Sequence, residues 1–286
     1  MASPDNSIST PPTSLASYDQ EQPPTTQFTT IKELCQVARQ ASGDYLVIQN
    51  VSPTNFEEII CQERRPFRIR RYHADRKILI VTIPTVLHEK LHLELYETFH
   101  EQLWPRRREI WTQIGSTTFR PQGHPGGDGG EGDSCGGPKP ARNHPVAWPT
   151  LVIEAGDSES LTALRDDMRW WFTASDHQVK IVLLSKFNHQ RQQIIIERWE
   201  EESQTRPGAT TTRRAAAFGA VQPVLRQSIT IKRNPATDSY QVVRGALVLS
   251  FRLLFLREPG PQEGDVIISI ADLQAYAQDV WAAVVP

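Results

Sequence analysis

The sequence predicts an α/β protein in which helices flank a mixed central sheet. Its 286 residues, 38% hydrophobic and 22% charged, have the composition of a globular protein and are enough for one large domain or two small ones. Residues 85–103 carry apolar side chains at helical spacing. After Trp148 the apolar pattern predicts a strand, a helix and two further strands, an order that places a helix across a sheet.

The N-terminal part of the chain divides into a tail and a small α/β portion. Residues 1–27 are rich in Pro, Ser, Thr and Gln and have few apolar residues, so a disordered tail is predicted. Residues 28–84 are the predicted N-terminal α/β portion. Thr30 and Glu33 have the form of a capping box, which starts a helix at Ile31. Strands are then expected at residues 45–48, 67–72 and 78–83, with a short helix at 55–61.

The strongest predicted helix, residues 85–103, contains the pattern His-Glu-Lys-Leu-His at residues 88–92. This pattern satisfies the HExxH motif, in which two histidines bind zinc and the glutamate acts as a general base. A zinc hydrolase also needs a third ligand and an enclosed cleft, and no extended metzincin signature follows. Because chance matches to three positions are common, the sequence favours a solvated helix face for His88 and His92. A zinc hydrolase is left as a minor alternative.

Two segments of low apolar content are predicted to be irregular. Residues 121–147 are rich in glycine and proline, which predicts a long flexible loop inside a core segment of residues 85–200. Residues 201–222 are polar and are predicted to form a linker. Residues 223–286 are predicted to form a β-rich C-terminal extension that closes with a helix. The extension has expected strands at residues 224–232, 240–243, 247–251 and 266–270.

The most informative segment is a strand at residues 151–154 that ends in a carboxylate, Glu154, and is followed by a helix over residues 159–172. An unpaired buried charge is costly, so such a glutamate is expected to be paired, exposed or bound to a metal. At 100° per residue, Arg165 and Arg169 lie along one border of the apolar face of the helix. The simplest expectation is a salt bridge between Glu154 and one of these arginines.

This segment resembles the restriction-endonuclease-like proteins of the PD-(D/E)XK superfamily, specifically uncharacterised fungal proteins related to a large bacterial set. The resemblance covers roughly residues 85–200 and rests on the order and spacing of several motifs. The matching stretches are Ile114-Gly-Ser-Thr-Thr, Gly132-Asp-Ser, Trp148-Pro-Thr-Leu-Val-Ile-Glu, Ser158-Glu-Ser and Leu164-Arg-Asp-Asp-Met-Arg-Trp-Trp. The implied fold is a restriction-endonuclease-like mixed central sheet flanked by helices.

The resemblance also implies an Mg²⁺ site made by an Asp, a Glu and a Lys. Asp133 corresponds to the family aspartate and Glu154 to the strand glutamate, so these two residues are the implied metal ligands. The family lysine two positions further on is here Gly156, and in the related bacterial set that lysine moves to the following helix, where Arg169 lies nearest. Arg169 is therefore the implied basic catalytic residue. Because arginine holds a phosphate but rarely releases a proton, the implied site is degraded.

Composition and charge limit the partners and the compartment. A net charge of −2 argues against extensive non-specific binding to the phosphate backbone of nucleic acid. A local basic cleft remains compatible with it. The basic run within residues 64–76 is expected to be a solvated strand face. The three cysteines lack disulfide or zinc-ligand spacing, which favours a reducing compartment, cytoplasmic or nuclear. No apolar stretch has the length of a bilayer span, so no membrane partner is expected, and no protein partner is indicated.

The sequence thus predicts a nuclease-like nucleic-acid-binding protein with a degraded Mg²⁺-dependent phosphodiesterase site at Asp133, Glu154 and Arg169. Whether the site cleaves is left open. The alternative is a non-catalytic protein-interaction scaffold that keeps the fold alone. The two hypotheses differ in whether Asp133, Glu154 and a basic side chain gather in one place.

Overall fold

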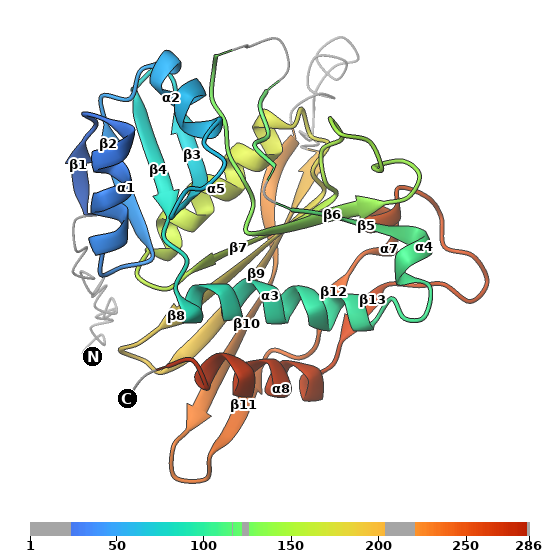
Figure 1. Cartoon of the computed structure of the whole chain (residues 1–286). Helices are drawn as coiled ribbons and strands as arrows, with labels where there is room; N and C mark the ends of the chain where they lie inside the picture. The colour runs from blue at the N-terminus through green and yellow to red at the C-terminus, as the bar shows by residue number, and fades with distance from the viewer. Residues whose placement is uncertain (1–23, 116, 122–125, 204–220, 285–286) are drawn as a thin grey trace, which may run out of the picture.

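Two sheets and a smaller strand pair form the protein, shown in Figure 1 as a computed structural model that describes residues 24–115, 117–121, 126–203 and 221–284. The larger sheet is mixed and has helices on both faces, so the predicted α/β class is confirmed. Within these ranges, no helix combines the length and the apolar character needed to cross a membrane.

The N-terminal sheet has the strand order β1-β2-β4-β3 and packs against two helices. Its elements are β1 (Thr25–Gln27), α1 (Ile31–Gln40), β2 (Tyr45–Gln49), α2 (Pro53–Ile60), β3 (Arg68–His73) and β4 (Ile78–Thr82). Thr30 caps α1 by accepting a hydrogen bond from the N–H of Glu33, as predicted. β1 pairs in parallel with β2, so residues 25–27 belong to the sheet and the predicted tail is too long. Residues 1–23 of that tail lie outside the described ranges.

The central sheet has seven strands in the order β11-β10-β9-β8-β7-β6-β5. These strands are β5 (Trp111–Ile114), β6 (Ser134–Pro138), β7 (Leu151–Gly156), β8 (Ile181–Asn188), β9 (Gln193–Ser203), β10 (Val221–Asn234) and β11 (Ser239–Val243). β7 and β8 pair in parallel, and the other neighbours pair antiparallel. The strand that begins at Leu151 and the first strand expected after the helix of residues 159–172, predicted over residues 179–184, are therefore neighbours in one sheet, as expected.

Helices cover both faces of this sheet, as Figure 1 shows. α3 (Val86–Glu101) and α8 (Ile270–Trp281) pack side by side on one face, and α5 (Leu161–Ala174) crosses β7 and β8 on the other. Side chains of β7 alternate between the faces: Ile153 joins the core under α3, and Val152 joins the core under α5. The next residue of this second set is Glu154, so its side chain is directed into the apolar layer between the sheet and α5.

The segment predicted as a C-terminal extension continues the central sheet, because β10 pairs with β9 and β11 pairs with β10. β12 (Leu247–Leu249) and β13 (Val266–Ile268) form a separate pair. Residue 251, predicted to end a strand, instead begins the short helix α7 (Phe251–Phe255); a second short helix is α4 (Arg107–Ile110). The predicted linker of residues 201–222 contains the end of β9 and the start of β10, and its residues 204–220 lie outside the described part of the chain.

The prediction of a flexible loop over residues 121–147 is wrong for the central part of that segment. β6 lies within it and is buried along its whole length. The glycines that suggested flexibility permit close packing here. A side chain on Gly136 would collide with the Tyr96 hydroxyl, the Trp111 indole nitrogen and the Thr112 carbonyl oxygen. β6 is therefore a strand that runs directly beneath aromatic side chains, and its position fixes residue 133 at the strand entrance.

Amide exchange separates the buried strand from the predicted loop. The N–H groups of Cys135 and Gly136 are expected to exchange slowly, since β6 is enclosed between β5 and β7. Residues 143–146, which are exposed and outside any strand, are expected to exchange rapidly. Hydrogen–deuterium exchange followed by mass spectrometry measures both segments in one digest. Equal, fast exchange of the two segments would contradict the assignment of β6.

Candidate metal centre

Strand β3 delivers two consecutive arginines into the protein interior. Arg70 and Arg71 are 1% and 0% exposed, so the expected solvated face of the basic run is wrong at these two positions. The register between β3 and β4 shifts between Ile69 and Arg71, a bulge that lets neighbouring residues turn toward the same side. At this bulge the side chains of β3 no longer alternate between the two faces of the sheet, and both guanidinium groups reach α5.

Asp167 on α5 joins the two arginines. Its carboxylate accepts hydrogen bonds from Arg70 Nε at 2.6 Å and from Arg71 Nε at 3.0 Å. Arg70 also forms an ion pair with Glu159, which lies just before α5. The guanidinium of Arg71 lies 3.8 Å from the ring centre of Trp170. These contacts connect the N-terminal sheet to the central sheet through buried charges.

Glu154 lies within β7 and is completely buried. Its Oε1 accepts a hydrogen bond from the indole of Trp171 and lies 3.7 Å from Arg71 Nη2. Its Oε2 has no hydrogen-bond partner among the described residues. Burial raises the pKa of Glu154 well above its usual range, and the nearby carboxylate of Asp133 raises it further.

The two arginines expected to pair with Glu154 bind elsewhere, so that expectation is wrong. Arg165 donates from Nε to Glu197 at 2.9 Å, and Arg169 donates from Nη1 to Asp166 at 2.6 Å on the surface. The side chain of Arg169 is 58% exposed, so it does not join the buried carboxylates. The reason is the rotation of α5: the residues that face the sheet are Leu164, Asp167, Met168, Trp171 and Phe172.

Asp133 lies just before β6, next to the end of β7. Ser134, the first residue of β6, is paired with Ile153 of β7. The Asp133 carboxylate accepts a hydrogen bond from the N–H of Ala155 at 2.9 Å. Burial opposes the charged form, but the imidazole of His88 holds the pKa of Asp133 below its usual range. The carboxylate is thus charged and fixed at the β6–β7 edge.

His88 and His92 of the HExxH pattern are both 0% exposed, so the expected solvated helix face is wrong. His88 Nε2 lies 3.3 Å from the Asp133 carboxylate, and His92 Nδ1 lies 2.8 Å from the Ser134 hydroxyl. One ligand atom from each of His88, His92 and Asp133 lies within 4.8 Å of the other two. Burial opposes protonation of His88, yet Asp133 raises its pKa to about 10.

Glu89, the central residue of this pattern, is engaged on both sides. One of its oxygens lies 3.4 Å from His92 Nε2, and the other accepts a hydrogen bond from Arg68 Nη2 at 2.9 Å. Arg68 thus covers the histidine side of α3, while the leucine side faces the sheet. α3 is therefore buried on two adjacent faces. The repeat of leucines every four residues predicted only one of them, the face that contacts the sheet.

Carboxylates outnumber guanidinium groups in the buried layer. Among the described residues, four carboxylates (Asp133, Glu154, Glu159 and Asp167) lie around three basic side chains (Arg70, Arg71 and His88), so there is a negative surplus when all four carboxylates are ionised. Burial raises the pKa of Glu159 to about 8 although Arg70 opposes this shift. Such a surplus is relieved by protons or by a divalent cation, because uncompensated buried charge is costly.

Sequence reasoning missed one further basic residue at this site. Lys186 pairs in register with Gly156, the position where the resemblance implies a lysine, and the alternation of β8 puts it on the same face as Glu154. Its ammonium donates to the carbonyls of Asp157 and Phe187, and burial lowers its pKa. A lysine between the apolar run of residues 181–184 and Phe187 was the available signal.

Asp167 and the arginines carried weaker signals. Asp167 interrupts the apolar face of α5 between Leu164 and Trp171, and a carboxylate in that place indicates a buried partner. Nothing in the local pattern of residues 68–73 indicated that the partner would be supplied by Arg70 and Arg71. No known family model matches the sequence, and no curated protein matches it either.

Proposed function

We propose that the chain is a restriction-endonuclease-like protein that binds nucleic acid and holds a divalent cation, Mg²⁺ in the cell, between Asp133 and Glu154. The observation that carries the proposal is the proximity of two buried carboxylates: Asp133 accepts a hydrogen bond from the N–H of Ala155, the residue after Glu154, and raises the pKa of Glu154. Glu154 Oε2 is buried and has no hydrogen-bond partner among the described residues. The strand–helix–strand–strand order after Trp148 supports the same family.

The residues present fit a hard divalent cation, because carboxylate oxygens are its preferred ligands. Asp133 and Glu154 would hold the ion, which when bound supplies a Lewis acid for a phosphate oxygen. Asp167 keeps the neighbouring Arg71 in place, and Trp171 orients Glu154. These side chains prepare a site for a phosphodiester rather than for a neutral substrate.

Cleavage is expected to be weak or lost for two reasons. Gly156 stands where the resemblance implies a lysine, and Arg169 lies on the surface with Asp166. Lys186 occupies the adjacent strand position but its ammonium is held by backbone carbonyls. The side chains of Asp133, Glu154 and His88 are at most 4% exposed, so a substrate reaches them only after the surrounding elements move apart.

A zinc hydrolase is the second candidate, favoured by the grouping of His88, His92 and Asp133. The third ligand that HExxH alone lacks is supplied here by the loop before β6. The ring nitrogens of His88 and the Nε2 of His92 are buried and have carboxylate oxygens at 3.3–3.6 Å, with no well-formed hydrogen bond among the described residues. Against this candidate, Glu89 is already paired with Arg68, so it is not free to act as a general base.

Calorimetry with two metals and two variants separates the candidates. If the carboxylates form the site, wild type binds Mn²⁺, Glu154→Gln loses that binding, and His92→Gln keeps it. If the histidines form the site, His92→Gln loses Zn²⁺ binding and Glu154→Gln keeps it. Glutamine preserves the size of Glu154 while removing the charge, so the comparison isolates electrostatics.

Glu202→Gln is the matched control, because Glu202 is 55% exposed and lies on the far part of β9. It is expected to bind both metals like wild type. A parallel incubation with supercoiled plasmid and Mn²⁺ reports cleavage. Absence of Mn²⁺ binding by the wild-type protein would overturn the proposal and leave the non-catalytic scaffold as the remaining interpretation.

A further inference from the structure

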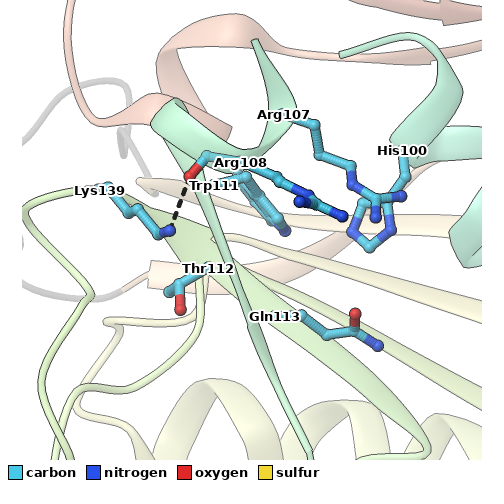
Figure 2. A pocket seen from close by; sticks show the side chains of 7 residues that line it. All are labelled: His100, Arg107, Arg108, Trp111, Thr112, Gln113 and Lys139. Atoms are coloured by element: carbon cyan, nitrogen blue, oxygen red, sulfur yellow. Dashed lines mark hydrogen bonds between the residues drawn. The ribbon is translucent and has the colours of Figure 1, made fainter. Parts of the chain in front are cut away.

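A basic pocket lies at the end of α3 opposite to the histidine pattern (Figure 2). Its cavity volume is about 280 Å³, and its lining includes His100 of α3, Arg107 and Arg108 of α4, and Lys139 just after β6. Figure 2 shows these four side chains around the pocket, with the Lys139 ammonium bonded to the backbone oxygen of Arg108. None of them takes part in the candidate metal centre.

Positive charge in this pocket exceeds negative charge. Arg107 Nη1 lies 3.0 Å from Glu97, which is the carboxylate that faces the pocket residues. In the described part of the chain, neither Arg108 nor Lys139 forms an ion pair, and Lys139 donates only to a carbonyl, at 2.8 Å. Three cationic groups are thus opposed by one carboxylate, which leaves a surplus of two positive charges.

The pocket also contains a buried polar atom that lacks a partner. His100 is 2% exposed; its Nδ1 lies 3.4 Å from Glu97, while its Nε2 has no hydrogen-bond partner among the described residues. Buried polar atoms are generally hydrogen-bonded in the functional state. Because Nδ1 faces the Glu97 carboxylate and carries the proton, Nε2 is an acceptor that a hydroxyl group of a ligand or a water can satisfy. The cationic surplus points to a compact anion with several acceptor oxygens.

We infer that this pocket binds a phosphate group of a nucleic-acid backbone. The inference rests on the proposed function for the choice of nucleic acid over a free phosphate. Arg and Lys are the side chains that recognise phosphate, Arg through its planar donors and Lys as a point charge. Thr112 and Gln113 add neutral polar groups to the lining.

The distance between the pocket and the metal centre is one that a single nucleic-acid strand can span. Both α3 and β6 run from the centre to the pocket. His88 and His100 are about 18 Å apart along the helix at 1.5 Å per residue. Asp133 and Lys139 are about 20 Å apart along the strand at 3.3 Å per residue. At 3.4 Å per nucleotide of one duplex strand, the pocket lies about five or six steps from the centre.

The test is binding of a fluorescent 20-base-pair duplex in EDTA, followed by anisotropy over a range of salt concentrations. The variant is the double change Arg108→Gln and Lys139→Gln, which removes charge and leaves the ion pair of Arg107 with Glu97 intact. Its affinity is expected to fall about tenfold or more, as hydrogen bonds to a charged group are lost. The slope of log K against log salt is expected to decrease by about one, the value for one phosphate contact.

Arg76→Gln is the control, because Arg76 is 70% exposed and lies in the N-terminal sheet, far from α4 in the sequence and in the fold. Duplex binding by wild type with an unchanged affinity and slope in the double variant overturns the inference alone. Failure of the wild type to bind any duplex overturns the proposed function as well. Inorganic phosphate that binds as tightly as the duplex assigns the pocket to free phosphate and overturns the backbone assignment.

Discussion

Asp167→Ala is expected to lower the free energy of unfolding by about 3–5 kcal/mol, the usual cost of removing one partner of a buried ion pair. The loss leaves Arg71 with only Glu154 at 3.7 Å and leaves Arg70 with only Glu159. Both guanidinium groups would remain almost completely buried. Equilibrium unfolding in urea, followed by tryptophan fluorescence and circular dichroism, measures the change.

The preceding residue provides the control. Asp166 is 69% exposed and pairs with Arg169 on the surface, so Asp166→Ala is expected to change the free energy of unfolding by less than about 1 kcal/mol. The two variants remove the same chemical group from neighbouring positions of one helix. Equal effects for both would show that the buried network contributes nothing beyond a surface pair.

Glu154→Gln is expected to make the metal-free protein more stable than wild type at alkaline pH. Because the pKa of Glu154 is raised in the folded state, the wild type has its full stability below the usual carboxyl pKa and loses it as pH rises toward the folded value. The difference between the two proteins therefore grows with pH, by at most about 1.4 kcal/mol per pH unit. The raised pKa of Glu159 acts in both proteins and largely cancels.

Addition of Mn²⁺ is expected to reverse this order. A cation at one hundred times its Kd stabilises the folded wild type by about 2.7 kcal/mol and leaves Glu154→Gln unchanged. Urea unfolding between pH 5 and pH 9, with EDTA and then with Mn²⁺, measures both effects. Parallel pH curves for the two proteins, together with no response to Mn²⁺, would contradict a charged metal-binding role for Glu154.

Elements with clear periodicity were predictable from the sequence. The strand before Glu154 and the strand over residues 179–184 were expected from short runs of apolar residues, and the helix between them was expected from apolar residues every three to four positions. β6 was missed because glycine removes the apolar signal that marks a buried strand. Its packing depends on Tyr96 and Trp111, which lie far away in the sequence.

The carboxylates of the site were predicted better than their partners. Asp133 lies just before β6 and Glu154 lies within the neighbouring strand β7, and the order of the motifs was enough to indicate both carboxylates. The prediction of Arg169 was wrong because Asp167 faces the sheet. At about 100° per residue, Arg169 lies two positions further on and points to the opposite side of the helix. The burial of Arg70 and Arg71 depends on a bulge in β3 and on Asp167 of the distant helix α5, and the alternation of side chains along one strand predicts neither.

The contacts between β3 and α5 also affect the order of folding during synthesis. Arg70 and Arg71 leave the ribosome 97 and 96 residues before their partner Asp167. At typical elongation rates that interval lasts on the order of 5–20 s. Throughout it the two guanidinium groups remain in water, because the helix that neutralises them has not been made. Within the ranges that the structure describes, the apolar core of the N-terminal sheet with α1 and α2 contains no residue of α5, so it is the ion pairs of Arg70 and Arg71, and not that core, that must wait for α5.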